Sequence, residues 1–261
     1  MFLIEQYQEL WRKSVFLVGK IRRLPVFPWV TWAVEDHSIS YDEISEALPL
    51  IQFGDVGLHR YSGYLANLAI SGFMIHAWVH TEQGMDGKIV EAVSEGVLHR
   101  SPFYGMYADY TIILRPKEVT ELERKGACKK AKQIIGSAYD VNFKFDIGKE
   151  LAYFRRRQGG NEELAKRHLE KGQPWIQKYH PAFTCTEVAA YSWWHRREAL
   201  GIKRTKLRGK SVILGDTFLN PGWNIVWASK TVTADSAKAL GLSGAGLDLI
   251  ADYRRQHPVK K

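Results

Sequence analysis

Cys185 stands where a cysteine thiol could act as a nucleophile. It lies between Thr184 and Glu187, in the stretch His180-Pro-Ala-Phe-Thr-Cys-Thr-Glu-Val. Thr and Glu three residues apart before an apolar run form a capping box, in which each side chain bonds a helix N–H that otherwise lacks an acceptor. The spacing therefore predicts Cys185 at the first helical position. The positive end of the helix dipole favours the thiolate there and can lower a cysteine pKa from about 8.5 to about 3.5–7.5.

A packing role is the alternative interpretation of Cys185. Free cysteine is among the most buried residue types and commonly behaves as a small hydrophobe. A cysteine hydrolase also needs an imidazole that carries the proton between thiol and leaving group, and a carboxylate or amide that orients this imidazole. The partners of Cys185 elsewhere in the chain therefore decide between the two roles.

His76 is the candidate for the imidazole among the nine histidines of the chain. It lies within Gly72-Phe-Met-Ile-His-Ala-Trp-Val-His80, which has the composition of a β-strand. Alternation along a strand puts His76, Trp78 and His80 on one face. A histidine in the middle of a strand is held rigidly, as a general base must be.

Glu91 is the candidate for the orienting carboxylate. It lies on the next expected strand, after the turn-forming residues 84–87. Antiparallel neighbours on one face bring Cβ atoms within about 5.5 Å, which is close enough for Glu91 to accept an N–H from His76. A different register of the turn would pair His76 with Glu95 and His80 with Glu91, and the sequence leaves both registers open.

Metal and cofactor chemistry find little support in the sequence. His76 and His80 have the H-x-x-x-H spacing that binds zinc on a helix, but the zincin pattern requires Glu where this chain has Ala77. On a strand the two histidines are about 13 Å apart. The glycine-rich residues 241–246 match neither a Walker loop nor a dinucleotide fingerprint. We expect neither a metal nor a cofactor.

The composition indicates a folded, basic protein. The chain has 261 residues, of which 45% are hydrophobic, and its net charge is +9. Such a length fits one large domain, and the charge favours anionic partners such as nucleic acid, lipid headgroups or an acidic cell wall. The two cysteines, Cys128 and Cys185, exclude both a disulfide framework and a four-cysteine zinc site.

The sequence also suggests where the protein acts. Glu5 and Glu9 interrupt the apolar core that a secretory signal requires, and no run reaches the roughly 18 apolar residues of a membrane span. We expect no signal peptide and no membrane span, and hence a cytoplasmic protein, or a virion-associated one if it is phage-encoded.

The hydrophobic pattern predicts an α+β fold in which an antiparallel β-sheet packs against helices. Helices are expected at residues 2–22 and 118–135, with Leu122 among the core-facing residues of the second. Strands are expected at 55–59, 73–79, 88–93, 109–114 and 223–227. The predicted organisation is an N-terminal helical extension at 1–45, a domain at 46–230 with a charged helical excursion at 149–171, and a basic C-terminal tail at 231–261.

The order of the motifs resembles the circularly permuted branch of the NlpC-type papain-like superfamily, the YiiX/YaeF-like proteins, which includes relatives of lecithin:retinol acyltransferase. The resemblance covers roughly residues 50–228. The motifs that carry it are Gly54-Asp55-Val-Gly, His76-Ala-Trp-Val, Ile89-Val-Glu-Ala-Val-Ser-Glu-Gly-Val97, Gly136-Ser-Ala-Tyr-Asp140, Phe183-Thr-Cys-Thr-Glu-Val188 and Val212-Ile-Leu-Gly-Asp216.

This resemblance implies a role for each candidate residue. In ordinary papain-like enzymes the cysteine helix precedes the histidine strand, whereas here the histidine comes first, as in the permuted branch. The resemblance implies a permuted papain-like sheet or barrel with Cys185 as nucleophile, His76 as base and Glu91 as third member. The backbone N–H of Cys185 would help bind the oxyanion. Thr186 departs from the family, whose members commonly have Ser at this position.

The implied activity is that of a thiol peptidase or amidase that cleaves an amide bond, and we expect a peptidoglycan peptide as its substrate. A basic cell-wall hydrolase without a signal peptide would suit a phage product that is released by lysis or carried among other virion proteins. One alternative is a lipid ester hydrolase or acyltransferase of the same superfamily. Another is a non-catalytic virion or nucleic-acid-binding module, since residues 196–210 carry seven basic side chains and one acidic one.

Overall fold

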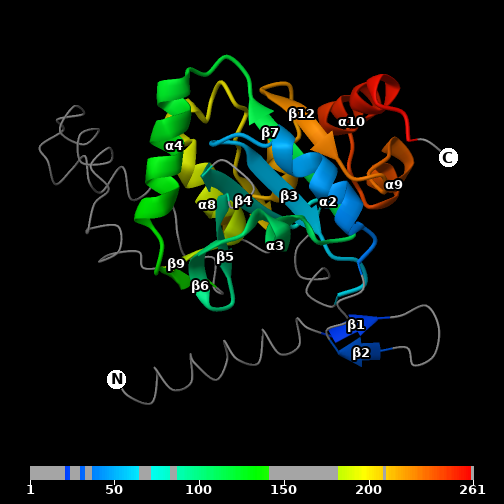
Figure 1. Cartoon of the computed structure of the whole chain (residues 1–261), viewed down its shortest axis with the longest axis horizontal. Coiled ribbons are helices and arrows are strands. Elements are labelled where there is room, and N and C mark those ends of the chain that lie inside the picture. The colour runs from blue at the N-terminus through cyan, green and yellow to red at the C-terminus, as the bar shows by residue number, and fades with distance from the viewer. Residues whose placement is uncertain are drawn as a thin grey trace, which may run out of the picture.

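The computed structural model describes residues 21–23, 30–32, 37–64, 72–82, 87–140, 182–207 and 210–259. These residues form a mixed α/β structure (Figure 1). The α-helices are α2 Tyr41–Ala47, α3 Pro102–Met106, α4 Glu121–Gln133, α8 Cys185–Ser192, α9 Ala234–Ala239 and α10 Ala245–Gln256. The strands are β1 Ile21–Arg23, β2 Val30–Trp32, β3 Val56–Arg60, β4 His76–Glu82, β5 Lys88–Val93, β6 Gly96–Arg100, β7 Tyr110–Pro116, β8 Ala138–Tyr139, β9 Ala182–Phe183, β10 Thr205–Leu207, β11 Lys210–Val212 and β12 Trp223–Ala228. Short 3-10 turns lie at Leu48–Leu50, Trp194–Arg196 and Gly215–Phe218.

A six-stranded antiparallel sheet forms the centre of the molecule. Its strand order is β12-β7-β3-β4-β5-β6, so β3 and β4 lie in the middle. The central strands are rich in β-branched and aromatic residues, which pack well on a pleated surface. Nearly every residue of β3 and β4 is buried, as expected of strands that are covered on both faces.

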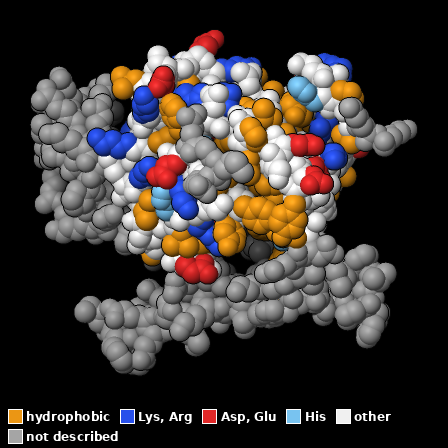
Figure 2. All heavy atoms as spheres, in the orientation of Figure 1, with side chains coloured by type: hydrophobic (Ala, Val, Ile, Leu, Met, Phe, Trp, Pro, Cys, Tyr) orange, Lys and Arg blue, Asp and Glu red, His pale blue; other side chains and the backbone are white. Residues whose placement is uncertain are grey.

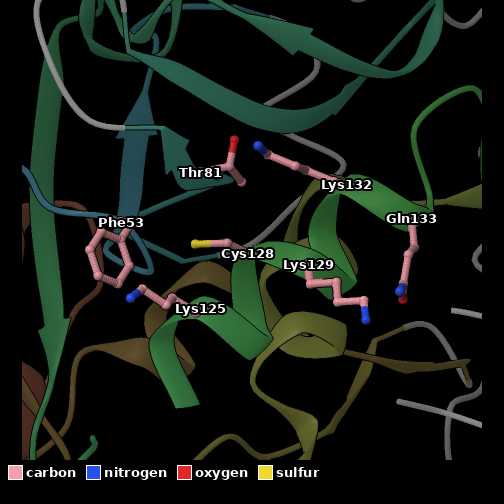
Figure 3. Close-up of a pocket in the computed structure, with 7 residues that line it drawn as sticks. All are labelled: Phe53, Thr81, Lys125, Cys128, Lys129, Lys132 and Gln133. Carbon is pink, nitrogen blue, oxygen red and sulfur yellow. The ribbon is translucent and has the colours of Figure 1, made fainter. Parts of the chain in front are cut away.

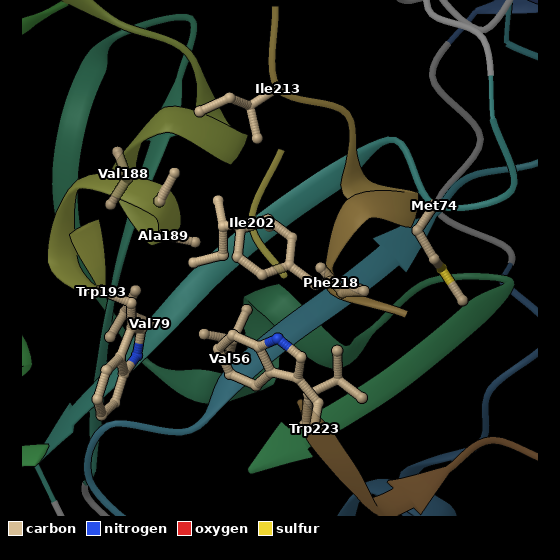
Figure 4. Close-up of a cluster of buried hydrophobic side chains, with 14 of the residues drawn as sticks. Val56, Met74, Val79, Val188, Ala189, Trp193, Ile202, Ile213, Phe218 and Trp223 are labelled. Carbon is tan, nitrogen blue, oxygen red and sulfur yellow. The ribbon is translucent and has the colours of Figure 1, made fainter. Parts of the chain in front are cut away.

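Two hydrophobic clusters cover the two faces of the sheet. The larger cluster joins Val188 and Ala189 of α8 to sheet residues such as Val56 and Val79 (Figure 4). The smaller cluster joins helices α2 and α3 to the opposite face, where Trp78 is its largest fully buried side chain. Successive side chains of β4 therefore pack into the two clusters in turn, because side chains alternate between the faces of a strand.

Trp78 requires an unusually close approach to its neighbouring strand. It lies directly opposite Gly57 in the β3–β4 pair, and a Cβ at Gly57 would fall 2.0 Å from the indole ring. The indole N–H of Trp78 donates to the carbonyl of Gly105 in α3, at 2.9 Å. These contacts fix the position of α3 beneath the first half of β4.

Helix α8 is buried on every side. All eight of its residues have less than a tenth of their surface exposed, since the helix packs against β4, β5 and α4. Its buried polar side chains are hydrogen-bonded, as a central position in the core requires: Thr186 donates to the carbonyl of Ile213, and Ser192 donates to that of Val188. Strand β9 lies immediately before α8 in the chain, and its parallel pairing with β8 sets Tyr139 opposite Phe183, two residues before Cys185.

The structure confirms the predicted α+β composition and the antiparallel sheet. Strands β3, β4, β5, β7 and β12 occupy the five predicted regions, although β4 begins at His76 rather than at residue 73. Helix α4 confirms the helix predicted at 118–135, but Leu122 is 80% exposed, so its core-facing assignment is wrong. Strand β6 and helix α3 were not predicted, since both are short and lie in Gly- and Pro-containing sequence.

Most of the predicted peripheral segments lie outside the described residues. This holds for the excursion at 149–171 and for residues 2–20 of the N-terminal helix, whereas residues 21–23 form strand β1. The division at 45/46 falls within α2 and stays a prediction. Residues 231–259 contain α9 and α10, and their buried residues Ala237 and Ile250 belong to the larger hydrophobic cluster, so this segment packs on the core.

Candidate active site

Cys185 occupies the first position of α8, as the sequence predicts. Thr184 is the N-cap and Glu187 completes the capping box: the Thr184 N–H donates to Glu187 Oε2 at 2.8 Å, and the Glu187 N–H donates to Thr184 Oγ1 at 3.4 Å. Cys185 is 4% exposed as a residue, and its Sγ lies 3.6 Å from the carbonyl oxygen of Ile75, just before β4. The helix terminus therefore points the thiol at the start of the strand that carries His76.

His76 is the first residue of β4 and lies beside both expected partners. Its Nε2 lies 2.9 Å from Glu91 Oε2, and its side chain is 17% exposed. Cα pairing sets Glu91 opposite Trp78 rather than His76, so the contact crosses the β4–β5 pair diagonally. Neither of the two expected direct registers is found, but the diagonal register brings the predicted residues together.

Glu91 is itself held by a second cation. Its Oε1 accepts a hydrogen bond from Arg100 Nη1 on β6 at 3.1 Å, and its side chain is only 3% exposed. A buried carboxylate requires such partners, because an unpaired buried charge is costly. Burial alone would raise the pKa of Glu91, but its hydrogen bond and charge attraction to His76 and Arg100 outweigh burial and lower it.

Cys185 and His76 form a coupled acid–base pair. Burial alone would raise the pKa of Cys185, but attraction to His76, a hydrogen bond with it and the backbone N–H groups of Ala77 and Thr186 lower it. Burial likewise disfavours the His76 imidazolium, but Cys185 and Glu91 together raise the pKa of His76 to about 10. The electrostatics therefore favour a thiolate–imidazolium pair, which is the reactive form of a cysteine nucleophile.

The other two predicted partners lie apart from this pair. Glu95 follows β5, in the turn before β6, and accepts a hydrogen bond from Ser94. His80 lies on β4 with His76, in the strand conformation that the sequence predicts, and burial lowers the pKa of His80 to about 4. Neither residue contacts Cys185 in the hydrogen bonds or ion pairs of the described residues.

Two further residues join the site without having been assigned a role from the sequence. Tyr139, on β8, forms a hydrogen bond with Cys185, and burial with the nearby charges of Cys185 and Glu187 raises its pKa well above the ordinary value. The phenol therefore stays protonated and is a donor. The motif Gly136-Ser-Ala-Tyr-Asp140 was the available signal for it. His59, on β3, stacks on His76, and no sequence pattern indicated that contact.

Cys128 lies in a separate pocket of about 530 Å³ beside α4 (Figure 3). Phe53 lines one side of it and Gln133 the other, and no member of the Cys185 site lines it. Burial raises the pKa of Cys128 to about 11, and its thiol donates to the carbonyl of His80 at 3.4 Å. Cys128 is therefore a protonated thiol at neutral pH, and its pKa is shifted in the opposite direction from that of Cys185.

The described residues hold neither the side-chain cluster of a metal site nor a helix of membrane-spanning character. They contain no group of three or more His, Cys, Asp or Glu side chains that could hold a metal ion. No helix among them is both long enough and apolar enough to cross a membrane. On the face drawn in Figure 2, Lys and Arg side chains are interspersed with acidic and hydrophobic ones.

Comparisons of the chain with protein-family models, with curated proteins and with solved structures find no match. The geometry of Cys185, His76 and Glu91 is therefore the basis on which a function can be argued.

Proposed function

We propose that the protein is a thiol hydrolase that cleaves an amide bond through an acyl-enzyme on Cys185. The observation that carries this proposal is the connected set of a helix-terminal cysteine, His76 and the buried carboxylate of Glu91. The three residues supply a nucleophile, a proton carrier and an orienting group, which is the constellation of cysteine and serine hydrolases.

Acylation follows from the charges of the pair. The Cys185 thiolate attacks the carbonyl carbon, and the new oxyanion lies near the backbone N–H of Cys185, which has no intrahelical acceptor at the first helical position. As the C–N bond breaks, the His76 imidazolium gives its proton to the departing amine nitrogen. The products of this step are a thioester on Cys185, a free amine and a neutral His76.

Deacylation restores the starting state. Neutral His76 takes a proton from water, and the hydroxide attacks the thioester carbon. The C–S bond breaks, the thiolate returns and the acid product leaves. Throughout, Glu91 accepts the Nε2–H of His76 and stabilises the imidazolium, while Arg100 keeps Glu91 ionised.

A permuted papain-like fold is part of the proposal. The chain order of His76 before Cys185, and the packing of the cysteine helix against the strand that carries the histidine, support it. We propose a peptide of the bacterial cell wall as substrate, and a phage origin in which the protein acts on the wall from a virion or after lysis. The net charge of +9 supports an acidic wall polymer as the partner.

The lipid-directed alternative is less well supported. In the acyltransferase relatives a second histidine typically occupies the place of Glu91, so the carboxylate here favours amide hydrolysis. A carboxylate partner also keeps the imidazolium charged to higher pH than a neutral histidine would.

The test is turnover by the full chain of muropeptides and, separately, of phospholipid vesicles, with Cys185→Ala and Cys128→Ala variants. We expect release of new amines from muropeptides by the wild type and by Cys128→Ala, and none by Cys185→Ala. Turnover of phospholipid alone would replace the substrate assignment. Muropeptide cleavage that survives in Cys185→Ala would refute the proposed nucleophile. Salt-dependent DNA binding without any turnover would favour the non-catalytic alternative.

A further inference from the structure

A second histidine lies face to face with the imidazole of His76. His59 on β3 is the direct cross-strand partner of His76 in the β3–β4 pair. The two ring centroids lie 4.4 Å apart and the ring planes differ by 21°, which is a stacked arrangement. His59 is 1% exposed and covers one face of the His76 ring, whose side chain is 17% exposed.

Its hydrogen bond fixes the state of His59. The ring Nδ1 lies 2.7 Å from the carbonyl oxygen of Gly105, which can only accept, so Nδ1 carries the proton. The same carbonyl accepts from Trp78, and a Cβ at Gly105 would lie 2.5 Å from the Trp78 nitrogen, so α3 cannot shift without disturbing both. Burial and the charge of His76 lower the pKa of His59 well below its ordinary value. His59 is thus a neutral ring with a fixed orientation.

We infer that His59 is the positioning residue for His76: its neutral ring forms a flat wall that holds the His76 ring with Nε2 toward Glu91 and the other nitrogen toward Cys185. A neutral aromatic face also tolerates a cation above it, whereas a charged neighbour would repel the imidazolium. Without this wall the His76 ring could turn about its χ2 torsion, which has broad minima, and the pair with Cys185 would weaken. This role rests on the proposed function, because it serves the same pair.

The charged and titratable groups around the pair come from several elements. Tyr139 of β8 lies near Cys185, Glu187 and Asp140. His76 faces Glu91 of β5, which also pairs with Arg100 of β6. Tyr61 meets the His59 ring edge-on, with centroids 4.8 Å apart. These groups remain in every His59 variant. A change in the pKa of Cys185 on replacement of His59 is therefore due to the loss of the His59 ring.

Two variants of His59 separate the ring from its hydrogen bond. His59→Phe keeps a flat ring and removes the donor to Gly105, whereas His59→Asn keeps an N–H donor near the same place and removes the ring. The measurement is the ultraviolet absorbance of the Cys185 thiolate against pH, taken as the difference between each protein and its Cys185→Ala counterpart. This readout needs neither substrate nor access to the buried sulfur. Ile44→Ala in α2, which truncates a buried apolar side chain of the smaller hydrophobic cluster, is the control for general destabilisation.

We expect His59→Phe and Ile44→Ala to titrate like the wild type and His59→Asn to hold about tenfold less thiolate at a pH on the acid side of the transition, which corresponds to about one pKa unit. If His59→Asn does not fold, the titration of His59→Phe alone tests the inference. Its curve must then coincide with that of the wild type, and a displaced curve would overturn the inference. A curve for His59→Phe displaced as far as that of His59→Asn, or two unchanged curves, would overturn the inference. A wild-type Cys185 with an ordinary or raised pKa would instead refute the proposed function, so the two failures are distinguishable.

Discussion

His76 and Glu91 are joined diagonally across the β4–β5 strand pair, with Nε2 of the imidazole 2.9 Å from Oε2 of the carboxylate. This bond occupies Nε2 and leaves the other ring nitrogen for Cys185. The diagonal contact arises because Glu91 lies opposite Trp78, two residues further along the strand, where a long carboxylate side chain can still reach back.

Removal of the charge on Glu91 should lower the pH at which the thiolate–imidazolium pair of Cys185 and His76 is lost on the alkaline side. Glu91→Gln retains an acceptor for His76 but loses the negative charge that raises the pKa of His76. A hydrogen bond to a charged group contributes about 1.5–3 kcal/mol, which corresponds to about 1–2 pKa units. We expect the pKa of His76, followed by NMR, to fall by about 1–2 units. The alkaline limit of activity should fall by the same amount. Glu95→Gln is the matched control, and an equal shift in it would contradict the diagonal contact.

Loss of Arg100 should destabilise the fold at neutral pH but not in acid. Because the folded pKa of Glu91 is lowered, its stabilising contribution is present above the unfolded value of about 4.3 and is lost as the pH falls through the folded pKa. We expect Arg100→Met to lower the free energy of unfolding at pH 7 by about 1–3 kcal/mol, and the difference to vanish at low pH.

Arg197→Met is the control for Arg100→Met. Arg197 pairs with the exposed Glu198 at 2.9 Å, and such surface pairs contribute only about 0–1 kcal/mol. Denaturant unfolding at several pH values measures both variants. A loss for Arg100→Met that persists unchanged into acid would show that its role is not exerted through the Glu91 charge.

The N-cap of α8 should matter for stability and for the thiolate together. Thr184→Ala removes one half of the capping box, which typically costs about 0.5–2 kcal/mol. Thr233→Ala removes the equivalent cap of α9, so it should cost a similar amount. Only Thr184→Ala should reduce the thiolate fraction of Cys185, as measured by thiolate absorbance after both stabilities are known from denaturant unfolding. Equal titration curves in the two variants would mean that the cap does not position Cys185.

Gly57 should not tolerate a methyl group. An added Cβ would overlap the Trp78 ring, and overpacking of a core typically costs about 1–3 kcal/mol or more. Gly126 in α4 has no heavy atom within 4 Å of an added Cβ, so Gly126→Ala should stabilise the protein by about 0.5–1 kcal/mol through helix propensity. Thermal unfolding of both variants measures these opposite signs. A neutral Gly57→Ala would contradict the packing of β3 on Trp78.

Local patterns predicted the elements of the site better than their arrangement. The capping box at Thr184 and Glu187 placed Cys185 at a helix start, and β-type composition placed His76 on a strand, because both signals depend on neighbouring residues. The register of β4 against β5 depends on the turn and on the shift between His80 and Glu82, which sequence spacing does not encode.

Contacts across several elements could not be predicted at all. Arg100 reaches Glu91 from β6, a strand that has no separate sequence signal, and His59 reaches His76 through a cross-strand pairing of residues 17 apart in number. Helices α9 and α10 were predicted as a tail, since a basic composition does not reveal that a few small apolar residues, such as Ala237, meet the core.

The most direct test of the activated cysteine is the pH titration of the two thiols in one protein, followed by thiolate absorbance in the wild type and in the Cys185→Ala and Cys128→Ala variants. We expect Cys185 to ionise below the ordinary thiol pKa of about 8.5, because His76 stabilises the thiolate, and Cys128 to ionise near 11. Ionisation of Cys185 at or above the ordinary value, with His76 neutral at pH 7, would contradict a thiolate–imidazolium pair at this site.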